Sequence, residues 1–349
     1  MKLTPTTQPG LRNPYSALRT PHSALRTSPR AFTLVEILIT VSLLSIITLG
    51  LFAVFNQVQR AFRSSMNQVD QLEAGRALTG MIPAELEQTT PCRSANAVTF
   101  YAQVIPSTIS APLTQFLPGM PTNTPRMNLL QDCYFLQRQN QTWIGIGYCV
   151  RTADPATGRL YLPETGPGQL GVGSLYRLST TNINNFLRSD GVPYDPNQLY
   201  IAIYNACNNL PIPAGLGVNT NRICDGIIHF CLQAYATNGF PIVSDGIHTN
   251  AYYRTNTSTL GYSIVRPAAA VANFNYPGGV AGLQFWSNAV PASVELQFGI
   301  LEQHALDRYN SLGAAQARLA YLQRDDVASR VQIFRQRVQI RNVDPSAYQ

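Results

Sequence analysis

The sequence from Ile37 to Phe55 reads ILITVSLLSIITLGLFAVF, nineteen residues without a charge. At ~1.5 Å of rise per residue, a helix of this length measures ~28 Å, enough to cross the ~30 Å hydrocarbon layer of a membrane. The polar members of the run are small enough to bond back to a helix carbonyl, and they are Thr40, Ser42, Ser45 and Thr48. A cleaved secretory signal usually has an apolar stretch of ~7–15 residues that ends at a small-x-small site. This run is longer and leads into Val54-Phe55-Asn56-Gln57, which offers no such site, so we expect the helix to be retained.

Positive charge is concentrated ahead of the apolar run. The chain has 349 residues and a formal net charge of +7, and the basic residues of segment 1–31, which contains no acid, are Lys2, Arg12, Arg19, Arg26 and Arg30. The rest of the chain is nearly neutral, so no nucleic-acid partner is expected. The basic leader predicts a cytoplasmic N-terminus, with the bulk of the chain across the membrane. With 45% hydrophobic and 12% charged residues, the composition excludes a charge-driven disordered protein.

One acid, Glu36, stands at the cytoplasmic end of the apolar run. An isolated carboxylate at that depth is costly unless it is paired or neutralised, and Lys or Arg suits the cytoplasmic end of a plain anchor better. A cut between Ala31 and Phe32 would supply a partner, because it would leave a free α-amino group four residues upstream of the acid.

The segment around this acid is Arg30-Ala31-Phe32-Thr33-Leu34-Val35-Glu36-Ile37-Leu38-Ile39. It resembles the class III signal of type IV prepilins and type II secretion pseudopilins. The resemblance implies that a prepilin peptidase cuts after Ala31, that Phe32 is then N-methylated, and that Glu36 pairs with the terminal amine of a neighbouring subunit in a filament. It implies as partners other pseudopilins or pilins and an assembly platform in the inner membrane. The sequence departs from the family in having Ala31 where Gly is usual, and in its longer leader.

An apolar stripe continues the helical period beyond the membrane segment. Its members are Phe55, Val58, Phe62, Met66, Val69 and Leu72, followed by Met81, Ile82 and Leu86. We expect this stripe to be buried against a sheet, and Pro83 to kink or restart the helix. The predicted organisation is a cleaved cytoplasmic leader at 1–31, a transmembrane helix at 32–55, an amphipathic continuation at 56–90 and a β-rich domain at 91–349.

The segment 91–349 predicts an antiparallel sheet. The fold class is therefore α+β: a long N-terminal helix, transmembrane in its first half and amphipathic in its second, packed on a β-sheet domain with long loops. The clearest signal is a hairpin from Asp132 to Arg151 with its turn near Asn140-Gln141. Other strands are expected at 97–104, 174–178, 199–204, 226–235, 283–286, 293–301 and 331–341, with a helix at 307–322. Surface loops such as 163–168 and the polar stretch 244–262 connect them.

Short stretches of this domain, and of the helix end that precedes it, resemble the minor pseudopilin J family of type II secretion. They are Ala84-Glu85-Leu86-Glu87-Gln88, Gly226-Ile227-Ile228-His229-Phe230 with Tyr235-Ala236-Thr237-Asn238-Gly239, and Val290-Pro291-Ala292-Ser293-Val294-Glu295-Leu296. The resemblance implies a structural minor subunit of a secretion pseudopilus, not an enzyme. It also implies a single-pass protein of the bacterial inner membrane with its C-terminal domain in the periplasm.

All six cysteines follow the membrane segment, and they are Cys92, Cys133, Cys149, Cys207, Cys224 and Cys231. An even number on the exported side favours disulfides over metal binding or catalysis. Cys133 and Cys149 are equidistant from residue 141 in the hairpin turn, so we expect them to face each other across two strands. The other four allow three sets of pairs, which the sequence does not separate, and we prefer Cys207–Cys224 with Cys92–Cys231.

The sequence contains no constellation typical of an enzyme. A zinc site built from Cys224, His229 and Cys231 lacks a pair at the usual ligand spacing. The histidines that remain for a nucleophilic site, His229, His248 and His304, have no GxSxG elbow or phosphate loop around them. We therefore expect no catalytic residue, no cofactor and no metal.

Two other functions stay open from the sequence alone. One is a minor pilin of a type IV pilus, competent for adhesion or DNA uptake through its large loops. The other is a membrane-tethered periplasmic enzyme whose prepilin-like start is coincidental.

Overall fold

The computed structural model describes residues 32–92, 94, 97–104, 112–117, 119, 125–140, 142–166, 169–181, 196–242, 252–253, 261–265 and 282–343. The leader 1–31, with Ala31, and most of the polar stretch 244–262 lie outside the described residues. The chain divides into two compact units, Met1–Arg60 and Ala61–Gln349.

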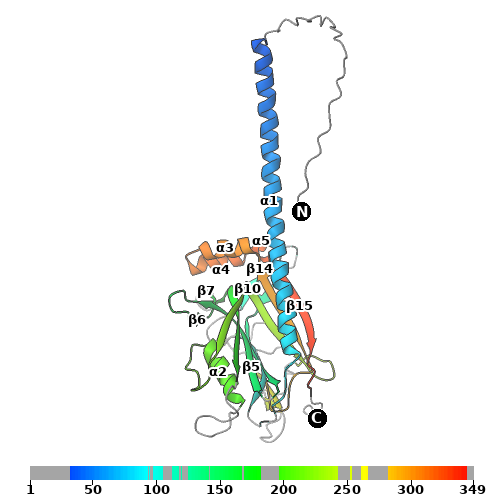
Figure 1. Cartoon of the computed structure of the whole chain (residues 1–349), viewed down its shortest axis with the longest axis vertical. Coiled ribbons are helices and arrows are strands. Elements are labelled where there is room, and N and C mark those ends of the chain that lie inside the picture. Colours follow the sequence, from blue (N-terminus) through cyan, green and yellow to red (C-terminus); the bar gives the residue numbers. More distant parts are fainter. Residues whose placement is uncertain are drawn as a thin grey trace, which may run out of the picture. The chain divides into compact units, whose positions relative to one another are not determined.

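Five helices are present in the described residues, and Figure 1 labels them along the chain. They are α1 (Leu34–Leu86), α2 (Asn197–Cys207), α3 (Gln303–Ser311), α4 (Ala315–Leu322) and α5 (Asp325–Ala328). The first eight strands are β1 (Val98–Val104), β2 (Leu113–Gln115), β3 (Arg126–Asn128), β4 (Gln131–Gln139), β5 (Thr142–Ala153), β6 (Leu160–Tyr161), β7 (Glu164–Gly166) and β8 (Gln169–Leu170). The remaining strands are β9 (Gly173–Thr181), β10 (Asn219–Tyr235), β11 (Tyr252–Tyr253), β12 (Gly261–Val265), β13 (Gly282–Trp286), β14 (Ser293–Leu301) and β15 (Val331–Gln339).

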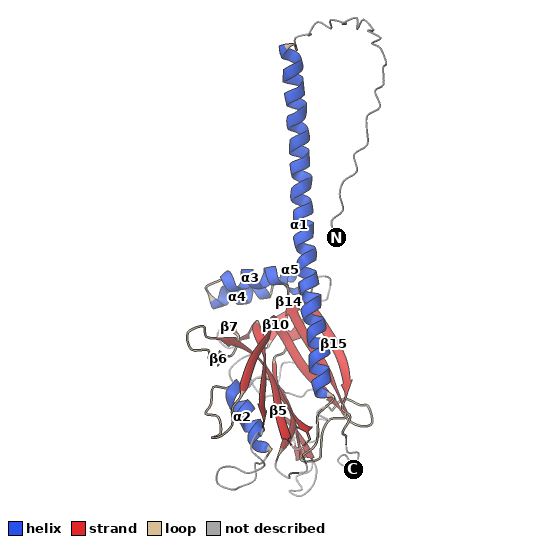
Figure 2. Ribbon diagram, in the orientation of Figure 1, coloured by secondary structure: helices blue, strands red, loops and turns tan. Residues whose placement is uncertain are grey.

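The described strands form one large antiparallel sheet and two small ribbons. The large sheet has the order β11-β12-β13-β1-β4-β5-β9-β10-β14-β15, with β6 beside β5. The sheet is curled, so that β4 and β10 approach each other although they are not neighbours in it. Leu130 and Phe230 form a bridge, and the Phe230 N–H donates to the Leu129 carbonyl at 2.7 Å. The long helix and antiparallel sheet confirm the α+β class (Figure 2).

The C-terminal third of α1 fills the inside of this curled sheet. Its buried residues recur at helical steps and are Gly75, Leu78, Ile82, Pro83 and Leu86. Leu78, Ile82 and Leu86 belong to a core cluster that also includes Phe100, Phe135 and Phe298. The helix continues through Pro83 to Leu86, so it does not restart at this proline. A proline removes one backbone hydrogen bond, and burial of this last turn in the core offsets that loss.

The segment expected as a strand at 199–204 is instead part of α2, which lies on the outer face of the sheet against β5 and β9 (Figure 2). Its aromatic and β-branched residues favour a strand locally. Leu199 and Ile203, four residues apart, pack as one helical face on the glycines Gly145 and Gly147 of β5. Tertiary packing therefore overrides local propensity here.

The helix expected at 307–322 is two helices. The first, α3, begins earlier, at Gln303, and ends at Ser311, where Leu312 takes an extended conformation with φ −80° and ψ 120°. The second, α4, begins at Ala315, after Gly313. By contrast, the hairpin of β4 and β5 and the strand at 293–301 are confirmed as predicted, and the strand expected at 226–235 is the end of the longer β10.

Candidate processing and assembly site

The start of α1 is closed by a reciprocal capping box between Thr33 and Glu36. The Glu36 N–H donates to the Thr33 hydroxyl at 3.3 Å, and the Thr33 N–H and hydroxyl donate to Glu36 Oε2 at 2.9 and 3.1 Å. This exchange satisfies two donors that a helix start otherwise leaves open. The carboxylate thus has a local partner that sequence reasoning missed, although the pattern Thr-x-x-Glu is visible in the sequence. Phe32 precedes the box and is 78% exposed.

The apolar run that follows is suited to lipid along its whole length. One 18-residue window of α1 has the length and composition to cross a membrane, and none of it is buried in the structure. Each polar side chain expected to bond back to the helix does so, as Thr40 donates to the Ile37 carbonyl at 2.9 Å and Ser45 to the Val41 carbonyl at 2.8 Å. Ser42 and Thr48 do the same. No hydroxyl of this run therefore needs water, which a hydrocarbon layer does not supply.

Beyond the membrane run, α1 turns its polar side to the sheet domain and its apolar stripe away. Asn67, two turns before the buried Gly75, donates to Glu302 at 3.2 Å, and Gln71, one turn before it, donates to the Ile300 carbonyl at 3.2 Å. The stripe Phe62, Met66, Val69 and Leu72 stays exposed. At 3.6 residues per turn, Phe62, Met66 and Val69 lie roughly opposite these two polar residues. Leu72 lies nearer the domain, where it lines a hollow with Gln71 and Glu302. The expectation that the whole stripe packs on the sheet is therefore wrong for these four residues.

The end of α1 is fastened to the sheet through Glu85, a role that the sequence did not reveal. Its carboxylate accepts hydrogen bonds from the Tyr148 hydroxyl at 2.5 Å and from Arg177 Nε at 2.9 Å, while its carbonyl accepts one from the Gln137 side chain at 2.6 Å. Burial would lower the pKa of Arg177, but the bond and charge of Glu85 outweigh it and the pKa is raised. Burial and the neighbouring carboxylate raise the pKa of Tyr148, so its hydroxyl stays a donor. These bonds join α1 to β4, β5 and β9.

The hairpin register separates the two cysteines that we expected to pair. Gln139 pairs with Thr142 across the turn, so Cys133 pairs with Tyr148 and not with Cys149. Because a one-residue offset moves a side chain to the other face of a sheet, Cys133 lies in the cluster beneath α1 and Cys149 in the cluster beneath α2. The Cys133–Cys149 pairing is therefore wrong.

The other expected pairs are not brought together either. Cys207 lies with Cys149 in the cluster beneath α2, whereas Cys224 packs against the cluster beneath α1. Cys231 is in a third cluster with Val104 and Leu129, away from Cys92, which borders the cluster beneath α2. These positions do not support Cys207–Cys224 with Cys92–Cys231.

His229 has a structural partner in the core. Its Nδ1 accepts a hydrogen bond from the Leu129 N–H at 3.0 Å. Burial, followed by the positive charges of Arg126 and Arg335, lowers its pKa to about 4. The ring is therefore neutral at physiological pH and acts as an acceptor. Within the residues that the structure describes, no three His, Cys, Asp or Glu side chains gather as a possible metal site.

Comparison with known proteins places one segment of the chain. Residues 26–52 match a family model described as the prokaryotic N-terminal methylation motif. The match contains the capping box and most of the apolar run, and it supports the type IV pilin and pseudopilin superfamily. Such a motif implies processing by prepilin peptidase, assembly with other pilins and anchoring in the inner membrane. No curated protein and no solved structure matches the chain.

Proposed function

We propose that this chain is a minor pseudopilin of a type II secretion system, of the J type. Prepilin peptidase cuts it between Ala31 and Phe32, Phe32 is methylated, and the helix then enters a filament. The leader stays in the cytoplasm, and the domain that follows the membrane helix lies in the periplasm. The observation that carries this proposal is the methylation motif at residues 26–52, which ends inside a helix long enough to span the membrane and continue into the domain.

The geometry of Glu36 supports a role in assembly. Its Oε2 accepts both hydrogen bonds from Thr33, and Oε1 takes no part in them. A carboxylate in hydrocarbon is costly without a partner, and the capping bonds do not neutralise its charge. The amine freed at Phe32 carries the opposite charge. Pairing the two between neighbouring subunits offsets part of the cost of burying both charges.

The outward stripe of α1 supports the same role. Phe62, Met66 and Val69 are exposed and lie on the side of α1 away from the domain, so they are free to pack on the helix of a neighbouring subunit. A contiguous apolar surface of this kind on an exported segment is a mark of an interaction site. The bonds of Glu85 to Tyr148 and Arg177 hold the sheet domain on this helix.

Substitutions at the capping box separate assembly from helix capping. Glu36→Gln keeps a side chain that closes a capping box and removes the charge. We expect both Glu36→Gln and Glu36→Ala to leave the domain folded and to abolish incorporation into filaments, measured by cross-linking to co-expressed pseudopilins. Thr33→Val is the matched control, because it weakens the cap and keeps the charge, and it should assemble. Normal assembly of Glu36→Gln would refute the charge-pair role.

The cross-linked partners and the effect of deleting the gene separate the two kinds of filament. A pseudopilin is expected to cross-link to secretion pseudopilins, and its deletion is expected to block secretion. Cross-linking to pilins, with loss of surface pili on deletion, would instead assign the chain to a type IV pilus.

A further inference from the structure

Helix α2 and strand β5 pack in matched steps. A Cβ built on Gly145 would lie 3.1 Å from the Leu199 Cβ, and one built on Gly147 would overlap Ile203 Cγ2. Two residues advance a strand by ~6.6–6.8 Å and four advance a helix by ~6 Å. Because both elements run in the same direction, the next step pairs residue 149 of the strand with residue 207 of the helix.

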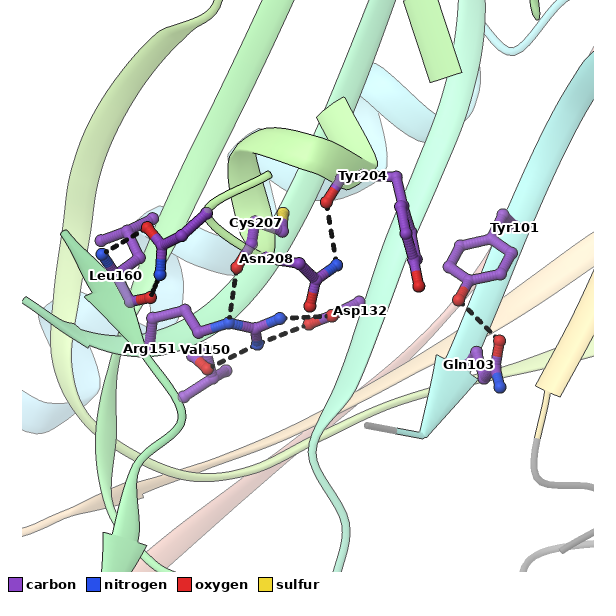
Figure 3. A network of polar contacts seen from close by, with 10 residues as sticks. Tyr101, Gln103, Asp132, Val150, Arg151, Leu160, Tyr204, Cys207 and Asn208 are labelled. Atoms are coloured by element: carbon purple, nitrogen blue, oxygen red, sulfur yellow. Dashed lines mark hydrogen bonds and ion pairs between the residues drawn. The ribbon is translucent and has the colours of Figure 1, made fainter. Parts of the chain in front are cut away.

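Those two positions are cysteines. Cys149 and Cys207 are 0% and 3% exposed and belong to one apolar cluster. The following residue on this face of β5, Arg151, donates from Nε to the Cys207 carbonyl at 3.1 Å, which fixes the end of α2 over the strand (Figure 3). A hydrogen bond with the Cys149 thiol, followed by burial, raises the pKa of Cys207 well above its ordinary value.

Arg151 is itself held in place. It is 1% exposed, and its guanidinium pairs with both oxygens of Asp132, at 2.8 and 2.5 Å (Figure 3). The carbonyl of Cys207 is thus tied to a buried ion pair that joins β4 to β5. The end of α2 has little freedom to move the Cys207 side chain away from Cys149.

We propose that Cys149 and Cys207 form a disulfide in the mature protein, which ties α2 to β5 across the outer face of the sheet. This inference rests on the proposed function, because disulfides persist in the periplasm and not in the cytoplasm. A disulfide needs Cα atoms ~4.4–6.8 Å apart, and a helix that lies directly on strand glycines permits so close an approach.

The oxidant is an oxidised thiol–disulfide oxidoreductase of the periplasm. One cysteine thiolate attacks its disulfide to form a mixed disulfide, and the second cysteine thiolate then displaces the oxidoreductase. Two electrons and two protons leave with the oxidoreductase as its reduced dithiol. Both cysteines are buried in the folded domain, and the raised pKa of Cys207 makes its thiolate scarce there. Oxidation therefore precedes the docking of α2.

Mass mapping of the full chain tests the pairing. Cells are treated with N-ethylmaleimide before lysis, and the protein is purified in detergent, denatured with the reagent still present so that buried thiols are labelled, digested without reductant and sequenced by mass spectrometry. We expect a Cys149–Cys207 cross-linked peptide without label. Cys149→Ser and Cys207→Ser should each lose it and leave the remaining partner labelled. Cys133→Ser is the matched control, buried in the same hairpin on the opposite face, and it should keep the cross-link.

Labelled thiols at both positions in the wild-type chain, or Cys207 joined to Cys92, would overturn the proposal. Protease treatment of spheroplasts then shows whether a wrong pairing or a failure of export explains the missing cross-link. A cleaved domain with free thiols shows that the pairing is wrong in an exported protein. A protected domain shows that export, and with it the proposed function, has failed. Refolding the reduced full chain in a glutathione buffer gives a further check that does not depend on export. The same Cys149–Cys207 cross-link should form in this buffer.

Discussion

Replacing Gly75 by Ala tests how α1 is seated on the sheet. The ring of Phe334 in β15 points end-on into the helix at this glycine, and a Cβ built there would lie within 2.5 Å of three ring atoms. The ring has little room to retreat, because it stacks on the buried Phe298 with centroids 5.1 Å apart and an interplanar angle of 16°. Overpacking of this kind costs ~1–3 kcal/mol, and three overlapped atoms place the cost near ~3 kcal/mol.

The helix itself gains from the same change. Ala is better than Gly in a helix interior by ~1 kcal/mol, so the net loss for Gly75→Ala is ~2 kcal/mol. Gly80→Ala is the matched control, because Gly80 is exposed in the same helix and nothing lies within 4 Å of its built Cβ. It should gain ~1 kcal/mol. The two variants should therefore differ by ~3 kcal/mol, which corresponds to ~6–12 °C in melting temperature.

Urea unfolding of the full chain in detergent micelles measures this difference. The chain's two tryptophans, Trp143 and Trp286, both lie in the sheet domain and report its unfolding by fluorescence. The wild type and both glycine variants are compared under the same conditions. Equal stabilisation by both substitutions would refute the seating of α1 on Phe334.

Two further changes test the core of the domain. Arg151→Met leaves the Asp132 carboxylate buried without its partner, and it should lower the free energy of unfolding by ~3–5 kcal/mol. Arg222→Met breaks an exposed pair with Asp225, and it should change the free energy of unfolding by no more than ~0.5 kcal/mol. Equal urea midpoints for the two variants would contradict this prediction. Burial lowers the pKa of His229 to about 4, below the ~6.5 of an unfolded chain, so the native state prefers the neutral ring. The neutral His229 ring contributes its full share to the free energy of unfolding above pH ~6.5. That share falls by up to ~3 kcal/mol as the pH decreases from ~6.5 through ~4. His229→Asn keeps an acceptor for the Leu129 N–H and should flatten the stability–pH curve over that range, and an unchanged slope would be the contrary result.

Local patterns were enough to predict several parts of this molecule. The run Ile37–Phe55, its hydroxyl side chains and the position of Glu36 depend on residues close in sequence. The β4–β5 hairpin and the strand at 293–301 were also recognisable, because alternation and turn residues act within one or two elements.

The predictions that were wrong concern features determined by residues distant in the sequence. Leu199–Tyr204 has the composition of a strand, and the glycines of β5 decide that it packs as a helix. The direction of the Phe62–Leu72 stripe depends on where the domain meets α1, which periodicity does not reveal. The residue that faces Cys133 depends on the length of the hairpin turn. Because Gln139 pairs with Thr142, Cys133 pairs with Tyr148 and not with Cys149. The bonds of Glu85 to Tyr148 and Arg177 join residues far apart in the sequence.

The mass of the N-terminus tests the central claim most directly. The full chain is expressed in a host with its own prepilin peptidase, purified from membranes and fragmented in a mass spectrometer. We expect every mature molecule to begin at an N-methylated Phe32, with residues 1–31 removed. A chain that retains Met1 after assembly, or that is cut within or beyond the apolar run, would contradict the account.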